Sequence, residues 1–268
     1  MRGHNMGKFR SVVFVGAGNL ATHLARALYE KGYEIKQIYS RTLESARRLA
    51  AMVNAESINT LEQITNQADL YITALTDEAL IELAPQLTKN REQGLWVHTA
   101  GSVSLDLWQG HCLHYGVLYP LQTFSKQRTI DFQQIPLFIE ASSEEDARQL
   151  LLLAENISGK VYQTTSKQRK SLHLAAVFAS NFTNHMYVLA ADWLKEYQLP
   201  FDVLLPLIDE TAEKVHSLNP REAQTGPAIR NDKKVICEHL AMLEQMPDLQ
   251  HIYHEISKSI LNSKEKNL

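Results

Sequence analysis

The hydrophobic pattern of the chain changes near residue 164. Before that point, short apolar runs alternate with segments whose apolar side chains recur every three or four positions. Short β-branched runs are typical of buried strands, and the longer period is typical of helices. After residue 164 only the helical period continues, in long stretches rich in alanine and leucine. The pattern therefore predicts two domains, residues 1–164 and residues 165–268.

The first domain is predicted to be an α/β fold with a doubly wound parallel sheet of the Rossmann type. Strands that alternate with helices of this length favour that arrangement. The second domain is predicted to be all-α. The expected strands cover 12–15, 33–40, 68–75, 95–102, 114–124, 135–142 and 160–164, and the expected helices of the second domain cover 166–197, 201–218, 233–246 and 248–261.

The first strand leads directly into two glycines, and a helical pattern follows. Gly16 allows a tight turn, and Gly18 lets the backbone approach a pyrophosphate at the helix start, where free N–H groups favour negative charge. Ala21 provides the small residue that packs between helix and sheet. This context predicts a dinucleotide-binding turn of the GxGxxA type, and the alternative is a tight turn without a ligand. The expected cofactor-binding residues are Gly16, Ala17, Gly18, Asn19 and Leu20.

The end of the second predicted strand bears on the choice of cofactor. Enzymes that use NAD usually have an acidic residue there, whereas this chain has Ser40, Arg41 and Thr42. A guanidinium and two hydroxyls suit a 2′-phosphate, so NADP is predicted in preference to NAD. The alternative is that Arg41 is a solvated cation and the hydroxyls cap the next helix. Leu75 and Thr76, after the third strand, are expected to touch the same cofactor.

Three polar clusters are candidates for substrate chemistry. The stretch VHTAGS places His98 and Ser102 at a strand end, where the histidine would supply a proton or a hydrogen bond; a structural histidine is the alternative. Lys170, His173 and Asn181 form a polar stripe on the first long helix, where the alternative is a solvated face.

The third cluster is QTGPAIRND, in which Pro227 suits the first turn of a helix. Gly226 and Arg230 are expected to hold a substrate carboxylate there. A capped helix with an ion pair between Arg230 and Asp232 is the alternative.

Composition narrows the classes of function. The chain has 268 residues, a net charge of −3 and a pI of about 6.4, which argues against nucleic acid or a membrane as partner. Cys112 and Cys237 are expected to be buried, inert thiols, and no metal site is predicted. No apolar stretch is long enough to span a membrane, and the first residues lack a signal peptide's apolar region, so a cytoplasmic location is expected.

Five motifs, GAGNLA, HTAGS, YPLQTF, LHLAAVFASNF and TGPAIRND, resemble a family of bacterial proteins that join a Rossmann domain to a C-terminal helical domain of unknown function. More distantly, the chain is similar to pyrroline-5-carboxylate reductase, ketopantoate reductase and the coenzyme-dependent NADP oxidoreductases. The resemblance implies a homodimer built through the helical domain. Tyr119 stands where the family often has histidine. The Lys-x-x-x-Asn pair of the hydroxyacid dehydrogenases is absent, because Leu174 follows Lys170 at that spacing.

Together these features predict an NADP-dependent oxidoreductase that transfers a hydride between the nicotinamide and a small carbonyl or imine substrate with an acid group. His173 and Asn181 would orient the reacting group, and His98 or Lys170 would handle a proton. The competing hypothesis is a dinucleotide-binding protein without catalytic activity, which senses the cofactor pool or supports a partner.

Overall fold

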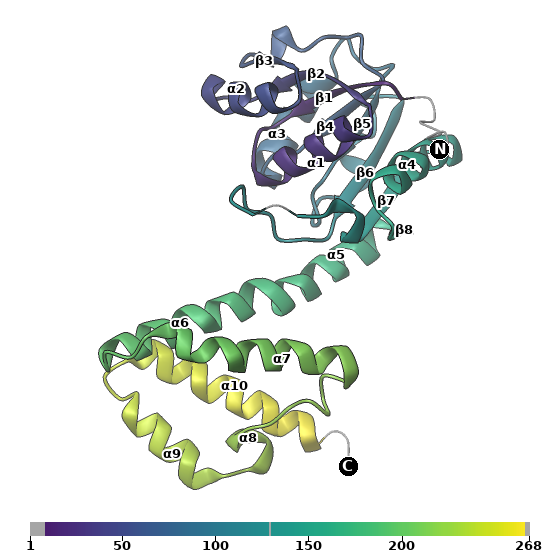
Figure 1. Cartoon of the computed structure of the whole chain (residues 1–268). Coiled ribbons are helices and arrows are strands. Elements are labelled where there is room, and N and C mark those ends of the chain that lie inside the picture. Colours follow the sequence, from purple (N-terminus) through teal and green to yellow (C-terminus); the bar gives the residue numbers. More distant parts are fainter. Residues whose placement is uncertain (1–8, 129, 266–268) are drawn as a thin grey trace. The chain divides into compact units, whose positions relative to one another are not determined.

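A computed structural model describes residues 9–128 and 130–265 of the chain (Figure 1). The chain divides into two compact units, Met1–Asn181 and Phe182–Leu268. The division falls inside the long helical segment and not after residue 164, because the first turns of that segment pack on the sheet.

The first unit contains an eight-stranded sheet in the order β3-β2-β1-β4-β5-β6-β7-β8. This order places the first strand in the middle, as in a doubly wound fold, and confirms the predicted class. The strands are β1 (Ser11–Val15), β2 (Glu34–Tyr39), β3 (Glu56–Ile58), β4 (Leu70–Thr73), β5 (Leu95–His98), β6 (His114–Pro120), β7 (Leu137–Ala141) and β8 (Val161–Gln163).

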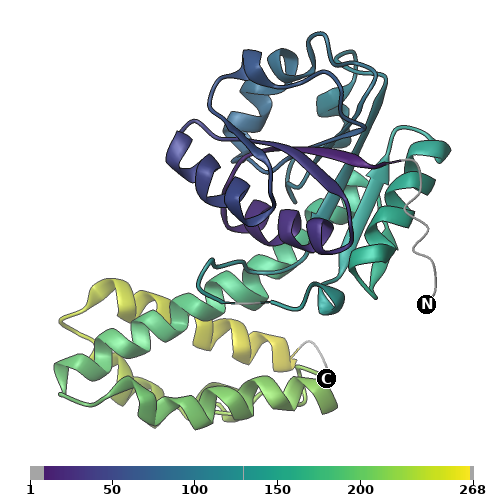
Figure 2. The same ribbon diagram turned by 45° about the horizontal axis from the view of Figure 1, so that its top comes forward.

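Helices cover both faces of this sheet, so β1 is buried on both sides. Val12 and Phe14 lie in one core with the apolar side chains of α1, α2 and α4. Val13 and Val15 lie in the second core, with those of α3. Figure 2 shows α2 at the β3 end of the sheet and α4 beside β6 and β7. The helices are α1 (Asn19–Glu30), α2 (Leu43–Met52), α3 (Asp77–Thr88) and α4 (Glu144–Ile157).

The sheet departs from the predicted parallel arrangement at one pair of strands. β6 and β7 are antiparallel, while the other neighbouring pairs are parallel. Among its described residues, the connection from β6 to β7 contains a short 3₁₀ helix, η3 (Phe132–Gln134), and no α-helix. The connection from β5 to β6 likewise contains a short 3₁₀ helix, η2 (Leu105–Trp108), and that pair is parallel, so the connecting segment does not by itself explain the direction of β7. The three-residue strand β3 was not predicted, because it is too short to show a period.

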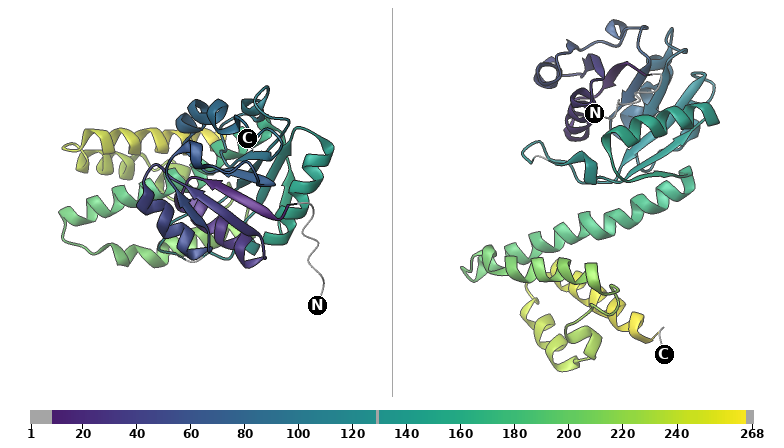
Figure 3. Two further views of the ribbon diagram at one scale, coloured as in Figure 1. Left: turned by 90° about the horizontal axis from the view of Figure 1, so that it is seen from above. Right: turned by 45° about the vertical axis from the view of Figure 1, so that its right-hand side comes forward.

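The helix α5 (Ser166–Ala176) begins in the first unit and continues through a π-helical stretch, η4 (Val177–Phe182), into α6 (Thr183–Glu196) of the second. The remaining helices of the second unit are α7 (Leu205–Ser217), α8 (Pro227–Arg230), α9 (Lys233–Met242) and α10 (Pro247–Glu265), which confirms the helical character predicted for the C-terminal part. In this unit α10 packs against α8 and α9 (Figure 3).

Few side chains of the second unit are enclosed by its own helices. Among its described residues, the buried apolar ones are Ala228 and Leu243. A cavity of about 490 Å³ opens between α6, α9 and α10, and its walls are almost entirely apolar. The helices of this unit therefore leave much of their apolar surface uncovered.

Two further expectations concern membrane-spanning helices and the two cysteines. No helix within the described residues is long and apolar enough to cross a membrane. Cys112 is half-buried, and burial raises the pKa of its thiol to about 12, so this residue is unreactive at neutral pH. The expectation of burial is wrong for Cys237, which lies on an exposed side of α9.

Candidate active site

The candidate residues of the first unit gather at one edge of the sheet. β1, β4, β5 and β6 run parallel, so their carboxyl ends meet at this edge. The segments that follow these strands contain the glycine turn, Leu75 and Thr76, the stretch from Thr99 to Ser102, and the loop after Pro120. Ligands of open α/β sheets bind at such an edge, next to the point where the strand order reverses.

The two glycines of the turn have different structural roles. Gly16 has a φ of 118°, and a Cβ built on it would lie 2.3 Å from the Ala74 carbonyl oxygen. Glycine at position 16 is therefore needed for the fold, whether or not a ligand binds. A Cβ on Gly18 would meet nothing within 4 Å. Gly18 caps α1 without any side-chain hydrogen bond, so the open space and the free N–H groups there fit a phosphate group.

Ser40, Arg41 and Thr42 lie where β2 ends, next to the glycine turn, whose Gly16 N–H donates to the Tyr39 carbonyl. The Arg41 side chain is exposed, and the structure records no hydrogen bond or ion pair for it among the described residues. Ser40 Oγ accepts a hydrogen bond from the Thr42 N–H at 3.4 Å. Burial raises the pKa of the neighbouring Tyr39, and the Arg41 charge partly opposes this shift.

The segment after β4 forms the start of α3. Leu75 is half-buried, and Thr76 caps the helix by accepting a hydrogen bond from the Ala79 N–H at 3.4 Å. Thr76 and not Asp77 is therefore the cap. The Asp77 carboxylate instead accepts a short hydrogen bond from the Ser102 hydroxyl, which ties the segments after β4 and β5 together.

His98 is fully buried at the end of β5 and takes the structural role that the sequence left as the alternative. Its Nδ1 accepts the Ala100 N–H at 3.2 Å, and its Nε2 lies 3.4 Å from the Ser104 carbonyl oxygen. Burial, assisted by the Arg169 charge, lowers the pKa of His98 to about 3. The ring is neutral at physiological pH and both of its nitrogens contact the loop after β5, which fits the structural role and not that of a proton donor.

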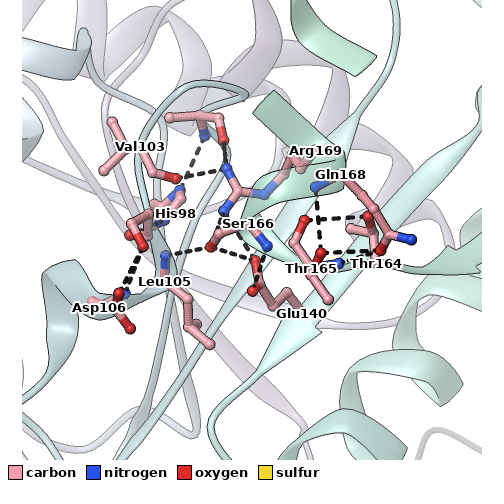
Figure 4. A network of polar contacts seen from close by, with 12 residues as sticks. His98, Val103, Leu105, Asp106, Glu140, Thr164, Thr165, Ser166, Gln168 and Arg169 are labelled. Carbon is pink, nitrogen blue, oxygen red and sulfur yellow. Dashed lines mark hydrogen bonds and ion pairs between the residues drawn. The ribbon is translucent and has the colours of Figure 1, made fainter. Parts of the chain in front are cut away.

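Arg169, which sequence reasoning missed, anchors α5 to the sheet (Figure 4). The side chain is fully buried, and its Nη1 donates to the carbonyl oxygens of Ala100, Gly101 and Val103 at 2.6–3.1 Å. Its Nη2 forms an ion pair with Glu140 Oε2 at 3.0 Å. The guanidinium thus fixes the loop after β5 against the first turns of α5. A single arginine in a polar stretch gives no sequence signal of this role.

His173 lies one turn after Arg169 and faces the same loop. Its Nδ1 is 3.1 Å from Tyr119 Oη. A Cβ built on Gly101 would lie 2.6 Å from the same Nδ1, so the glycine makes room for the imidazole. Burial raises the pKa of Tyr119, which keeps its hydroxyl protonated and able to donate to Nδ1. The direction of this hydrogen bond depends on the tautomer of the ring, and for Nε2 the structure records no partner among the described residues.

The other members of the predicted polar stripe do not take part in the contact of His173 with Tyr119 and Gly101. Lys170 is exposed, and Asn181 is exposed eight residues beyond His173, roughly 12 Å further along the helix. Both are placed on the same long helix, but the contacts with the loop after β5 are made by Arg169 and His173.

Gly226 and Arg230 belong to the second unit. Gly226 has a φ of 105° and precedes the four-residue helix α8. Arg230 is exposed, and among the described residues no ion pair with Asp232, the alternative from the sequence, is recorded; Asp232 caps α9 by accepting the Val235 N–H at 3.3 Å. The assignment of Gly226 and Arg230 to a substrate carboxylate stays a prediction.

The fold and this site define a class: a Rossmann-type dinucleotide-binding protein with an appended helical unit. Residues 11–100 match the family model described as NADP oxidoreductase coenzyme F420-dependent, and residues 135–260 match a domain of unknown function, DUF2520. These matches confirm the resemblance drawn from the motifs. No curated protein matches the chain.

A solved structure shows which family the chain belongs to. A "putative NADP oxidoreductase" from Bacteroides fragilis is 58% identical, over 95% of this chain and 98% of that one, with a TM-score of 0.91. The chain therefore belongs to the same family of NAD(P)-dependent oxidoreductases.

Two more distant structures share the fold. An imine reductase from Myxococcus stipitatus in complex with NADP⁺ is 16% identical, over 96% of this chain and 93% of that one, with a TM-score of 0.65. A pyrroline-5-carboxylate reductase from Coxiella burnetii is 13% identical, over 97% of this chain and 98% of that one, with a TM-score of 0.56.

Proposed function

We propose that the protein is an NADP-dependent reductase of a small carbonyl or imine substrate with an acid group. The observation that carries the proposal is the placement of His173, held against Gly101 and Tyr119 at the sheet edge that also contains the glycine turn. A dinucleotide site and a proton donor at one edge are the two parts that such a reduction needs.

The glycine turn and the end of β2 would hold the cofactor. Gly18 leaves open space and free N–H groups for the pyrophosphate, and Leu75 and Thr76 flank the turn. Arg41 has no partner in the described part of the chain, so its guanidinium is available for the 2′-phosphate, with Ser40 and Thr42 beside it. These features favour NADP over NAD. When bound, the nicotinamide supplies the hydride.

His173 would supply the proton. In its doubly protonated form, the ring donates Nδ1–H to Tyr119 Oη and passes the Nε2 proton to the substrate heteroatom as the hydride reaches its carbon, which leaves the imidazole neutral. Tyr119 acts as a positioning residue that fixes the ring orientation. Ser102, Lys170 and Asn181 are further proposed contacts of the substrate, with Gly226 and Arg230 of the second unit.

We further propose that the protein is a homodimer built through the second unit. Large apolar side chains of this unit are exposed in the single chain, among them Leu205, Leu207 and Val215 on α7. The apolar cavity next to α10 is a second apolar surface of this unit, and exposed apolar surfaces of this kind often mark protein–protein contacts. A second copy of the same surface is a symmetric way to cover it.

The test is an initial-rate assay with NADPH and a panel of keto acids and cyclic imines. Wild type should turn over at least one substrate, and His173→Gln should lower kcat by a factor of about 100 or more, as expected for a lost general acid. Tyr119→Phe should lower kcat less, because it removes only the positioning hydrogen bond. If NADPH binds and no substrate on the panel is reduced, the dinucleotide-sensing alternative is favoured. Unchanged turnover in His173→Ala and Asn181→Ala would remove both residues from the mechanism.

A further inference from the structure

The segment that follows β6 returns to the start of α1. The Phe124 carbonyl oxygen accepts a hydrogen bond from Asn19 Nδ2 at 2.9 Å, and the Ser125 carbonyl oxygen lies 2.9 Å from His23 Nε2. The Phe124 ring also packs on the His23 ring, with centroids 5.5 Å apart. Two side chains from the first turns of α1 therefore hold the backbone of this segment.

This attachment brings a lysine to the glycine turn. Lys126 Nζ donates a hydrogen bond to the Ala17 carbonyl oxygen at 3.0 Å, and Ala17 lies between the two glycines. The ammonium has three N–H donors, of which this contact uses one. No ion pair of Lys126 with a carboxylate is recorded among the described residues, and the first turn of α1 contains no acidic residue.

We propose that Lys126 is a cofactor-binding residue, whose ammonium pairs with the pyrophosphate of the bound dinucleotide. The inference rests on the proposed function and adds a residue to it. A positive charge fixed beside the free N–H groups of a helix start favours the doubly charged pyrophosphate more strongly than the helix alone. The loop after β6 thereby becomes part of the cofactor site.

The test measures dissociation constants of NADPH and NADH for wild type, Lys126→Met and Lys126→Arg, at low and moderate salt. Lys36→Met is the matched control, because Lys36 Nζ also donates to a backbone carbonyl, that of Gln67, at the opposite edge of the sheet. Both dinucleotides carry the pyrophosphate, so Lys126→Met should weaken both by about tenfold. Binding by Lys126→Met should also be less sensitive to salt than binding by wild type. Loss of a purely structural hydrogen bond would leave the salt dependence unchanged. Lys126→Arg should restore most of the affinity, and Lys36→Met should leave it unchanged.

Several outcomes would overturn the inference. Equal affinity of wild type and Lys126→Met, with NADPH bound by both, would remove Lys126 and leave the proposed function intact. A loss confined to NADPH would place the ammonium at the 2′-phosphate instead. An equal loss in Lys36→Met would assign the effect to stability. If wild type binds neither dinucleotide, the inference and the proposed function both fail.

Discussion

At the residue scale, His173 is held by two neighbours that leave one ring nitrogen open. Tyr119 fixes Nδ1, and the missing side chain of Gly101 makes room for the ring. His98 has the opposite surroundings, because both of its nitrogens contact the backbone and its exposed area is zero. Two histidines near one sheet edge therefore have different chemistry, which depends on burial and hydrogen bonding.

The space at Gly101 gives the first prediction. Gly101→Ala places a methyl group where the His173 ring lies, so the ring must move by an ångström or so. Displacement of this size should lower kcat by about 100-fold, while the NADPH dissociation constant stays close to wild type. Gly159→Ala is the control, because its Cβ would meet only the Gln133 carbonyl oxygen, at 3.4 Å. An unchanged kcat in Gly101→Ala would separate His173 from the reaction.

The burial of His98 gives a prediction about pH. Its folded-state pKa of about 3 lies below the ordinary value of 6.5, so protonation favours the unfolded chain. The stabilising contribution is complete above pH 6.5 and is lost as the pH falls towards 3. Between pH 7.5 and pH 4.5, this one group should cost about 3 kcal/mol of unfolding free energy.

The measurement is urea denaturation of wild type and His98→Asn at both pH values. The difference between the two pH values should shrink by about that amount in the variant, whatever its stability at pH 7.5. An equal pH dependence in both proteins would show that His98 does not titrate between the folded and unfolded states.

Residue roles were predictable from the sequence where a motif fixes the local backbone. The GxGxxA turn identified Gly16 and Gly18, and the stretch HTAGS identified a loop of small residues. The role of Arg169 was not predictable, since it depends on three carbonyl groups far away in the chain. His173 was a candidate from the sequence, but its contact with Tyr119 was not predictable, because the two residues are 54 positions apart and meet only when α5 packs on the sheet.

At the element scale, the ion pair between Arg169 and Glu140 holds the start of α5 in the first unit. Glu140, on β7, also accepts hydrogen bonds from the N–H and hydroxyl of Ser166, at the start of α5. The helix that continues into the second unit is therefore attached to the sheet by its first turns. The hydrophobic pattern shows only where strands stop, so it predicted the change of domain at 164/165.

Removing this anchor should destabilise the first unit. Arg169→Met leaves the Glu140 carboxylate without its cationic partner and three carbonyl groups without their donor, and the expected loss is about 3–5 kcal/mol of unfolding free energy. Lys167→Met, on an exposed position of the same helix, should change stability by less than about 0.5 kcal/mol. Chemical denaturation of both variants measures the difference. Similar stabilities would mean that the network contributes little.

At the scale of the whole molecule, the second unit has little interior of its own. Its helices were predictable from their period, but the sequence alone did not show how few of their apolar side chains are enclosed within one chain. Such a unit is expected to be completed by another surface, which supports the proposed homodimer.

The assembly is tested by light scattering on the eluting protein. Wild type should have twice the 30.4 kDa mass of one chain. Leu207→Asp places a charge on the exposed apolar side of α7 and should shift the protein towards the monomer. Glu213→Lys, on an exposed polar position of the same helix, should not. A wild-type mass of one chain at assay concentration would contradict the homodimer.

We propose that the glycine turn and the end of β2 bind NADP. The most direct measurement is a fluorescence titration of wild type and Arg41→Ala with NADPH and NADH. We predict saturable binding of NADPH by wild type, weakened about tenfold in Arg41→Ala, and NADH binding that is weaker and insensitive to this change. Absence of binding for both dinucleotides would contradict the account, because the glycine turn would then be structural and the reductase would have no source of hydride.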